Sequence, residues 1–234
     1  MSEVEPARGA ELPVPKPAGP ATRGQRVLYR VVRAILLAIA RVLWRLRVDG
    51  LEHVPPTGSF VLAPVHRSNV DFLLVLAVTR RRMRYMGKAS IWKVKALWPL
   101  FDALGGFPVQ RGTADRQALR TCIEVIGHGE PLVLFPEGAR QSGPDVKPLF
   151  DGATYVASRT GVPIVPVGIG GSERALPKGK KLPRPVRITL VVGPPLTVEV
   201  GDDGKAPRRA VRETSERLRL ELQRLFDEAE AKAG

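Results

Sequence analysis

The sequence has little cysteine and little histidine: Cys122 is alone, and the three histidines are His53, His66 and His128. A single cysteine cannot form an internal disulfide, so nothing in the composition indicates an oxidising compartment. Cys122 lies in a helix-like pattern over residues 114–127, where we expect a small buried hydrophobic residue and no nucleophile. His53 and His128 have no neighbours at a recognised metal-ligand spacing. We therefore expect no metal site and no bound cofactor.

No stretch of the sequence is both apolar and long enough to span a bilayer, which takes ~20 predominantly apolar residues. The longest apolar pattern, residues 26–47, contains six arginines and no acidic residue. On a helical wheel the arginines share one arc of about 160°, and the opposite side carries Val31, Ile35, Ile39, Val42 and Leu46. This predicts an amphipathic helix that lies in a membrane interface. The alternative is a surface helix whose apolar stripe packs on its own domain.

The first 24 residues contain five prolines and no apolar run of the kind found in signal peptides. We expect residues 1–24 to form a disordered tail, residues 25–48 the basic membrane-associating helix, and residues 49–234 one catalytic domain. Without a secretion signal, the expected location is the cytoplasmic face of the cell membrane, with peripheral or monotopic attachment.

Aromatic residues make up only 6% of the chain, whereas the formal net charge is +14. Such a charge indicates a polyanionic partner, which can be nucleic acid, an anionic membrane or a phosphorylated metabolite. A basic nucleic-acid-binding protein stays open as an alternative, although the sequence has no aromatic RNA-binding motif and no zinc spacing. The basic stretch at residues 79–88 is expected either to contact lipid headgroups or the phosphates of another partner, or to form a solvated loop.

Short apolar runs alternate with helix-like segments beyond residue 58. The runs are rich in Val, Ile and Phe, as buried strands are, and they occur at 59–65, 83–87, 107–110, 132–136, 163–169 and 186–192. Helical patterns are found at 70–80, 90–103, 114–127 and 151–160, and a last amphipathic helix is expected at 207–232. This alternation predicts an α/β fold with a mixed, largely parallel sheet flanked by helices.

The stretch APVHRSNVDF places Asp71 five positions after His66. On a regular helix these side chains are about 140° out of register. They can meet if His66 lies in the turn after the strand and Asp71 in the first helical turn, with Ser68 or Asn69 capping the helix. A carboxylate that orients a histidine is typical of a general base. The alternative is a local hydrogen bond at a helix start.

Two further polar clusters follow strand-like runs. GGFPVQRG carries Arg111, and FPEGARQSG carries Glu137 and Arg140 on a turn that contains glycine. Guanidinium groups bind phosphate or carboxylate through paired hydrogen bonds. Ligand sites in open α/β sheets lie beyond the carboxyl ends of the strands. Together with His66, these clusters favour a site for a phosphorylated substrate over a set of turns and surface ion pairs.

Four segments resemble the ordered motifs of the glycerolipid acyltransferase family, typified by 1-acyl-sn-glycerol-3-phosphate acyltransferases. They are HRSNVD (66–71), GGFPVQR (105–111), FPEGAR (135–140) and VPIVPVG (162–168). The resemblance spans residues 60–170 in order, spacing and residue type. The sequence departs from the family at Ala139, where members often carry Thr or Ser, and at PLFDGA with Asp151, where a lysine-rich stretch is usual.

The resemblance implies transfer of an acyl chain from acyl-CoA or acyl-carrier protein, as co-substrate, to a glycerophosphate hydroxyl at a phospholipid membrane. It implies that His66 is the base and Asp71 its partner. It assigns the acyl-acceptor site to Arg111, Glu137, Gly138 and Arg140. The family's fold is the same α/β arrangement.

The chemistry needs no protein nucleophile, because the sequence has no G-x-S-x-G elbow and a thioester is already activated. The main expectation is that the acceptor is 1-acyl-sn-glycerol-3-phosphate and the product phosphatidic acid. Glycerol-3-phosphate or another lyso-lipid stays open as the acceptor, and so does a membrane-binding module without catalysis.

Overall fold

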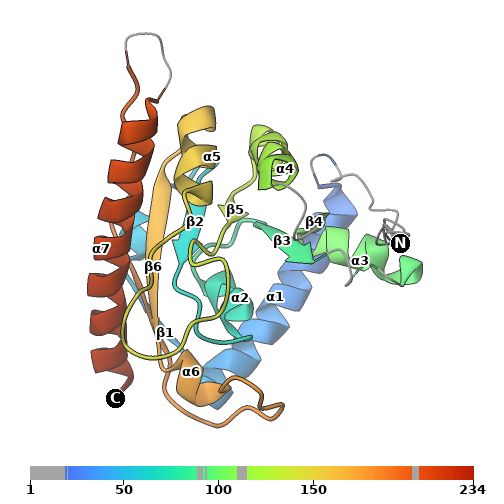
Figure 1. Cartoon of the computed structure of the whole chain (residues 1–234). Coiled ribbons are helices and arrows are strands. Elements are labelled where there is room, and N and C mark those ends of the chain that lie inside the picture. The colour runs from blue at the N-terminus through green and yellow to red at the C-terminus, as the bar shows by residue number, and fades with distance from the viewer. Residues whose placement is uncertain (1–18, 20, 89–91, 93, 110–114, 202–205) are drawn as a thin grey trace, which may run out of the picture.

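The computed structural model describes residues 19, 21–88, 92, 94–109, 115–201 and 206–234. Within them seven strands form one sheet in the order β1-β7-β6-β2-β5-β3-β4 (Figure 1). The strands are β1 (Arg47–Asp49), β2 (Val61–Pro64), β3 (Arg84–Lys88), β4 (Gly106–Val109), β5 (Leu132–Val133), β6 (Ile164–Gly170) and β7 (Thr189–Val192). Only the pair β6 and β7 is antiparallel among these strands. The predicted α/β fold with a mixed, largely parallel sheet is confirmed.

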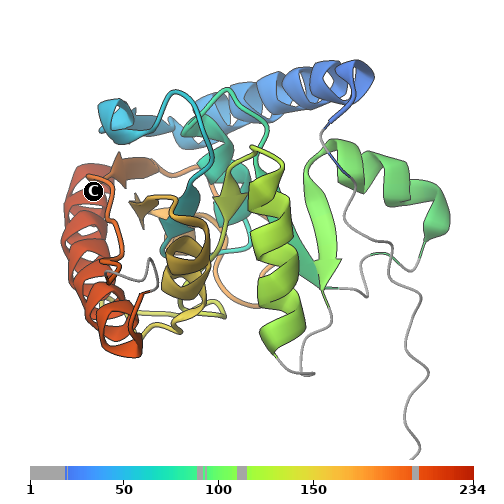
Figure 2. The same cartoon turned by 90° about the horizontal axis from the view of Figure 1, so that it is seen from above.

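Helices cover both faces of the sheet. Figure 2 shows α1 and α2 on one side and α4, α5 and α7 on the other. The helices are α1 (Arg23–Trp44), α2 (Asp71–Leu74), α3 (Trp98–Ala103), α4 (Asp115–Gly127), α5 (Gly152–Thr160), α6 (Ser172–Ala175) and α7 (Arg208–Ala233), with 3-10 turns η1 (Leu51–His53), η2 (Val75–Ala77) and η4 (Lys95–Leu97). The central strands β2 and β6 are buried along their whole length, as strands covered on both faces must be.

Several elements differ from the sequence prediction, among them β1, α2, β5 and the helix expected at 90–103, whose described part forms η4 and α3. β1 was not expected, because its alternating exposed residues carry no apolar signal; it forms through parallel pairing with β7 at the sheet edge. The helix expected at 70–80 is short and continues as the 3-10 turn η2. The strand expected at 132–136 is limited to two residues. In each case pairing with neighbouring elements, and not local propensity, sets the boundary.

Helix α1 begins and ends with clear local signals. Thr22 and Gln25 form a capping box, in which each side chain accepts the other's backbone N–H. The helix ends before Arg45, whose φ of 45° is left-handed. α1 therefore ends three residues earlier than the expected segment 26–47, and the chain turns into β1.

The side of α1 that packs on the protein is not its apolar stripe. Tyr29, Leu37, Ala40 and Trp44 are buried on the packed side. The stripe predicted from the sequence is exposed instead: Val31 is 51%, Ile35 56%, Ile39 52% and Val42 84% exposed, and only Leu46 is half-buried. The alternative that this stripe packs on its own domain is therefore wrong for these four residues. None of the helices in the described ranges has the length and hydrophobicity needed to cross a membrane.

The basic stretch 79–88 is partly internal. Arg82 is 6% exposed and donates to Glu130 at 2.5 Å, while the fully buried Arg84 pairs with Glu130 and Asp102 at 3.4 and 3.7 Å. Buried guanidinium groups require such partners. These two arginines therefore hold β3 against its neighbours, and the expectation of a lipid-contacting or solvated loop is wrong for them.

Helix α7 lies directly on β6 because β6 carries glycine on the facing side. A Cβ at Gly168 would come within 2.2 Å of the carbonyl oxygen of Leu225, and a Cβ at Gly170 within 2.2 Å of that of Ala229. Backbone atoms cannot give way as a flexible side chain can. The two glycines set the distance between the sheet and its longest described helix.

Replacement of Gly168 by alanine should destabilise the protein by about 1–3 kcal/mol or more, since the added methyl group forces α7 away from β6. The measurement is urea unfolding followed by circular dichroism. The matched control is Gly127→Ala, in α4, where an added Cβ meets nothing within 4 Å; it should leave stability unchanged or slightly higher. Equal stability of the two variants would contradict the packing argument.

Candidate active site

His66 lies in the turn that follows β2, and Asp71 is the first residue of α2. His66 Nδ1 is 3.0 Å from Asp71 Oδ2, although the two side chains could not face each other on one helix. The same oxygen accepts the backbone N–H groups of Arg67 at 2.6 Å and Ser68 at 2.7 Å. An oxygen that already accepts two backbone N–H groups favours a ring N–H as its third contact. In that tautomer His66 Nδ1 donates to Asp71, and Nε2 keeps a free lone pair.

The geometry of this turn differs from the expected cap. The N-cap of α2 is Val70, which makes no side-chain capping bond, and Ser68 Oγ donates instead to the carbonyl of Leu176 at 2.8 Å. The prediction of a Ser68 or Asn69 cap is wrong, because the buried Asp71 carboxylate itself accepts the N–H groups of the turn. One aspartate thus shapes the turn and orients the histidine.

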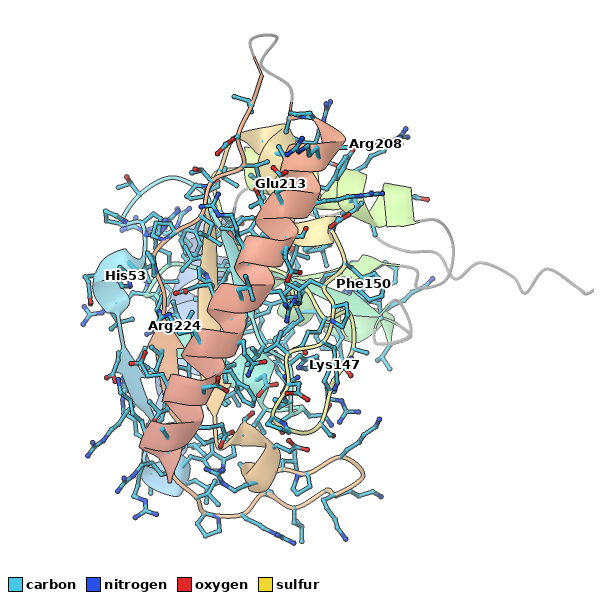
Figure 3. All side chains as sticks on the ribbon, turned by 60° about the vertical axis from the view of Figure 1, so that its left-hand side comes forward. His53, Lys147, Phe150, Arg208, Glu213 and Arg224 are labelled. Atoms are coloured by element: carbon cyan, nitrogen blue, oxygen red, sulfur yellow. The ribbon has the colours of Figure 1, made fainter. Side chains whose placement is uncertain are left out.

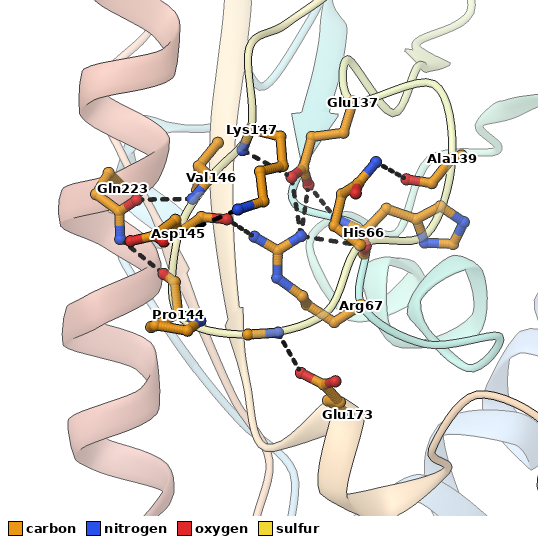
Figure 4. A network of polar contacts seen from close by, with 12 residues as sticks. His66, Arg67, Glu137, Ala139, Pro144, Asp145, Val146, Lys147, Glu173 and Gln223 are labelled. Atoms are coloured by element: carbon orange, nitrogen blue, oxygen red, sulfur yellow. Dashed lines mark hydrogen bonds and ion pairs between the residues drawn. The ribbon is translucent and has the colours of Figure 1, made fainter.

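A buried ion pair holds the backbone of His66 (Figure 4). Arg67 Nη1 donates to both carboxylate oxygens of Glu137, at 2.8 and 3.0 Å, and the two side chains are almost completely buried. Glu137 Oε2 also accepts the backbone N–H of His66 at 3.0 Å. The Arg67 guanidinium lies 4.7 Å from the centre of the Phe226 ring of α7. The pair therefore joins the loop after β2, the loop after β5 and α7.

The loop between β5 and α5 is tied down by further bonds (Figure 4). Gln141 N–H donates to the His66 carbonyl at 2.8 Å, and Arg67 Nη2 donates to the carbonyl of Asp145 at 3.1 Å. Gln223, on α7, accepts the N–H of Val146 at 2.7 Å. The loop that carries Glu137 and Arg140 is therefore fixed against both His66 and α7.

The four residues assigned to the acceptor have different surroundings. Glu137 is 2% exposed and bound to Arg67, so its carboxylate holds the loop in place. Gly138 lies on the cavity beside His66 with a φ of 69°, and a Cβ there would meet the Phe150 ring at 2.7 Å. Arg140 is half-buried and makes no ion pair within the described part of the chain. Arg111 lies outside the described residues.

A cavity of about 1220 Å³ contains His66 in its wall. Toward α1 the wall is mostly apolar and includes Leu36, Leu76 and Trp92, although Arg33 of α1 also lines it. The Phe135 ring lies over the imidazole with 4.2 Å between ring centres, which restricts its orientation. Because the imidazole is only 19% exposed and borders this cavity, its free Nε2 can meet a substrate that is largely withdrawn from water.

The other described side chains with catalytic potential are buried or lie away from the cavity. Burial raises the pKa of the Cys122 thiol to about 12, so the thiol stays protonated at neutral pH. His53 Nδ1 donates to the carbonyl of Val192 at 2.9 Å, away from the cavity. Across the described residues no group of three or more His, Cys, Asp or Glu side chains is placed to hold a metal ion.

Sequence reasoning missed Arg67 and Phe135. Both lie inside the quoted motifs, Arg67 directly after His66 and Phe135 two positions before Glu137, but no role was assigned to them. An arginine between two polar residues gives no sign of burial, since arginine is mostly exposed. The one available signal was the position of both residues at strand ends, next to predicted site residues.

Comparisons with known proteins show the family of the chain. The model of the family described as "Acyltransferase" matches residues 45–170. The chain is 28% identical to 1-acyl-sn-glycerol-3-phosphate acyltransferase of Bacillus subtilis over 170 residues, which cover 72% of this chain and 82% of that protein. It is 28% identical to 1-acyl-sn-glycerol-3-phosphate acyltransferase alpha of Mus musculus, over 76% of this chain and 65% of the mouse protein. The chain covers 40% of a chloroplastic relative of Brassica napus, at 27% identity over 57% of this chain.

The fold also has a solved counterpart. The crystal structure of PlsC, the 1-acyl-sn-glycerophosphate acyltransferase of Thermotoga maritima, superposes with a TM-score of 0.70. The superposition covers 89% of this chain and 83% of that one, at 23% identity. At this identity the likeness establishes the shared α/β fold.

The structural role of Glu137 predicts a loss of stability on Glu137→Ala. The substitution leaves Arg67 buried without its carboxylate, and breaking a buried pair in this way costs about 3–5 kcal/mol. Chemical denaturation measures the free energy of unfolding. The control is Arg140→Gln, from the same loop, which should stay within about 0.5 kcal/mol of the parent because no described partner is lost. If Glu137→Ala were as stable as the parent, Glu137 would not act through the buried pair.

Proposed function

The chain belongs to the acyltransferase family, and we propose that it transfers an acyl chain from a thioester to the free hydroxyl of 1-acyl-sn-glycerol-3-phosphate, giving phosphatidic acid. The acceptor is suggested by the names of relatives from Bacillus subtilis and Mus musculus. The observation that carries the proposal is the pair His66 and Asp71, which has the arrangement of a general base at the wall of a large, mostly apolar cavity.

The proposed reaction is a direct transfer. His66 Nε2 takes the proton of the acceptor hydroxyl while that oxygen attacks the thioester carbonyl, and Asp71 stabilises the imidazolium that forms. The tetrahedral intermediate then collapses: the C–S bond breaks, a C–O ester bond remains, and the imidazolium proton passes to the leaving thiolate. No side chain is acylated, which agrees with the buried and protonated Cys122.

The apolar part of the cavity suits the acyl chain. Its walls between His66 and α1 include Leu36, Leu76, Trp92 and Phe101. Burial of each methylene contributes about 0.8 kcal/mol, so a long chain can be held firmly without polar contacts. The thioester carbonyl would then lie near the imidazole.

Arg111 and Arg140 are the proposed ligands of the acceptor phosphate. Arg140 precedes Gln141, whose N–H is bonded to the His66 carbonyl, so the half-buried guanidinium belongs to the loop that contacts the base. It has no acidic partner in the portion of the chain that is described. For Glu137 we propose a positioning role, through Arg67 and the His66 backbone.

His66→Ala should lower transfer by about 10²–10⁴-fold or more, because the hydroxyl loses its base. The assay uses purified full-length protein with acyl-CoA and with acyl-carrier protein as donors. The acceptor panel is 1-acyl-sn-glycerol-3-phosphate, glycerol-3-phosphate and lysophosphatidylcholine. His53→Gln is the control, and it should keep the parent's rate. Full turnover by His66→Ala would sink the mechanism, and a preference for either other acceptor would replace the proposed substrate.

The exposed stripe of α1 is proposed to bind the membrane from which the lyso-lipid comes. Val31, Ile35, Ile39 and Val42 form one continuous exposed apolar strip. Exposed arginines, including Arg30 and Arg41, flank it and match anionic headgroups in charge. Val32 and Leu36 directly follow Val31 and Ile35 in the same helix, and their side chains line the cavity beside His66. Attachment through this helix would place the cavity beside the bilayer, and we propose the cytoplasmic face.

Ile35→Asp together with Val42→Asp should weaken binding to anionic phospholipid vesicles by at least about tenfold per position, since each loses roughly 1.5 kcal/mol of apolar burial. Vesicle sedimentation measures the partition coefficient. Leu220→Asp is the matched control, because Leu220 of α7 is exposed to the same 56% as Ile35. Unchanged partitioning of the α1 variant, or an equal loss in the control, would contradict attachment through α1.

A further inference from the structure

We propose that Tyr155, Arg159, Arg208 and Arg212 form a binding site for the nucleotide end of the acyl donor, which makes coenzyme A thioesters the donor class. The inference rests on the proposed function and goes beyond it by choosing one donor. All four residues line the same cavity as His66. They lie on the side of the cavity formed by α5 and the start of α7, and the apolar walls lie toward α1.

The four residues form two pairs with helical spacing. Tyr155 and Arg159 are four residues apart on α5, and Arg208 and Arg212 are four apart on α7, so each pair presents one face of its helix. Figure 3 shows Arg208 at the upper end of α7 and Phe150, which also lines the cavity, farther down beside the same helix. Two like charges at this spacing destabilise a helix. An anion bound between them would remove that cost.

The other basic residues of α7 are mostly paired with acidic neighbours. Arg209, Arg219, Arg224 and Lys232 each form ion pairs of 2.6 to 2.8 Å. Arg33 of α1 also lines the cavity and donates to the carbonyl of Leu76 at 2.9 Å. Over the described ranges, the structure gives no ion pair and no side-chain hydrogen bond to Arg159, Arg208 or Arg212. Their guanidinium groups are exposed and available to a ligand. The start of α7 also favours a bound anion, because the helix has no acidic residue in its first turn and no side-chain cap at Pro207.

The chemistry of the site fits a coenzyme A nucleotide. Three guanidinium groups match a pyrophosphate and a 3′-phosphate, whereas a carrier protein's phosphopantetheine arm offers a single phosphodiester. Tyr155 is 40% exposed at the cavity wall and provides an aromatic face on which adenine can stack. Pantetheine would run from this site along the cavity to His66, so that the thioester meets the base.

The test is direct binding of unacylated coenzyme A to the full-length His66→Ala protein, which cannot turn over. Isothermal titration calorimetry compares it with versions that also carry Arg159→Gln, Arg208→Gln, Arg212→Gln or Tyr155→Leu. Each should weaken coenzyme A by about tenfold, the loss expected for one charge-assisted hydrogen bond or one stacked base. Affinity for pantetheine, which lacks the nucleotide and both phosphates of the pyrophosphate, should be the same in every variant.

Arg217→Gln is the matched control, because Arg217 is exposed on α7, makes no ion pair with any described residue and does not line the cavity. Its coenzyme A affinity should equal that of the parent. Parent-like affinity in the cavity variants, or an equal loss in Arg217→Gln, overturns the site. An equal loss of binding to anionic vesicles also overturns it, in favour of a lipid phosphate. Recognition of phosphopantetheinylated carrier protein without coenzyme A binding overturns it in favour of the carrier.

The experiments distinguish a failure of the proposed function from a failure of the proposed coenzyme A site. Normal coenzyme A binding by the parent, with loss in the variants, supports the site even if the acceptor panel shows no transfer. Transfer to the lyso-lipid with undiminished coenzyme A binding in the variants supports the reaction and overturns the site.

Discussion

The active site depends on one buried ion pair, between Arg67 and Glu137. Two charges withdrawn from water are costly, and the cost is offset only when geometry is good and the remaining donors and acceptors are bonded. Here Glu137 also accepts the His66 N–H, and Arg67 also donates to the carbonyl of Asp145. The pair therefore works as a clamp between loops that follow the adjacent strands β2 and β5. Without it, the base would sit on a turn with no lateral support.

Through this clamp the sheet also fixes the position of His66, the proposed base. Register between β2 and β5 fixes where each strand ends, and the clamp transfers that register to the turn that holds His66. Asp71 then fixes the ring nitrogen through an oxygen that already holds two backbone donors. A base held by strands, an ion pair and a carboxylate keeps its orientation without help from the substrate, which is what preorganisation requires.

Apolar and basic residues lie mostly on different sides of the cavity. Its apolar walls lie toward α1, whose exposed stripe faces outward, and its basic residues lie at α5 and α7. This arrangement matches a substrate that has a long apolar chain at one end and an anionic group at the other. The arginines behind the net charge of +14 therefore have different roles. Some arginines, such as Arg82 and Arg84, are internal and structural, and others remain available at the cavity.

The sequence allowed the fold class, most of the strands and the pair His66 and Asp71 to be predicted. Buried parallel strands are apolar along their length, and the motifs that follow them are local in sequence. The edge strand β1 was not predicted, because its three residues form a strand only through pairing with β7 and carry no pattern of their own. For α1 the sequence predicted a membrane-facing apolar stripe and left packing on the domain open, because a helical wheel finds two faces but does not say which one meets the protein; in the structure the stripe is exposed.

By itself, then, the sequence determined which residues could do the chemistry, since residue type and spacing along the chain are its own properties. Only the tertiary structure decided that Glu137 is engaged by Arg67, that the apolar stripe of α1 is exposed, and that Arg159 and Arg208 border the same cavity. These are contacts between segments tens to more than a hundred residues apart. They follow from how the elements pack, and no local pattern records them.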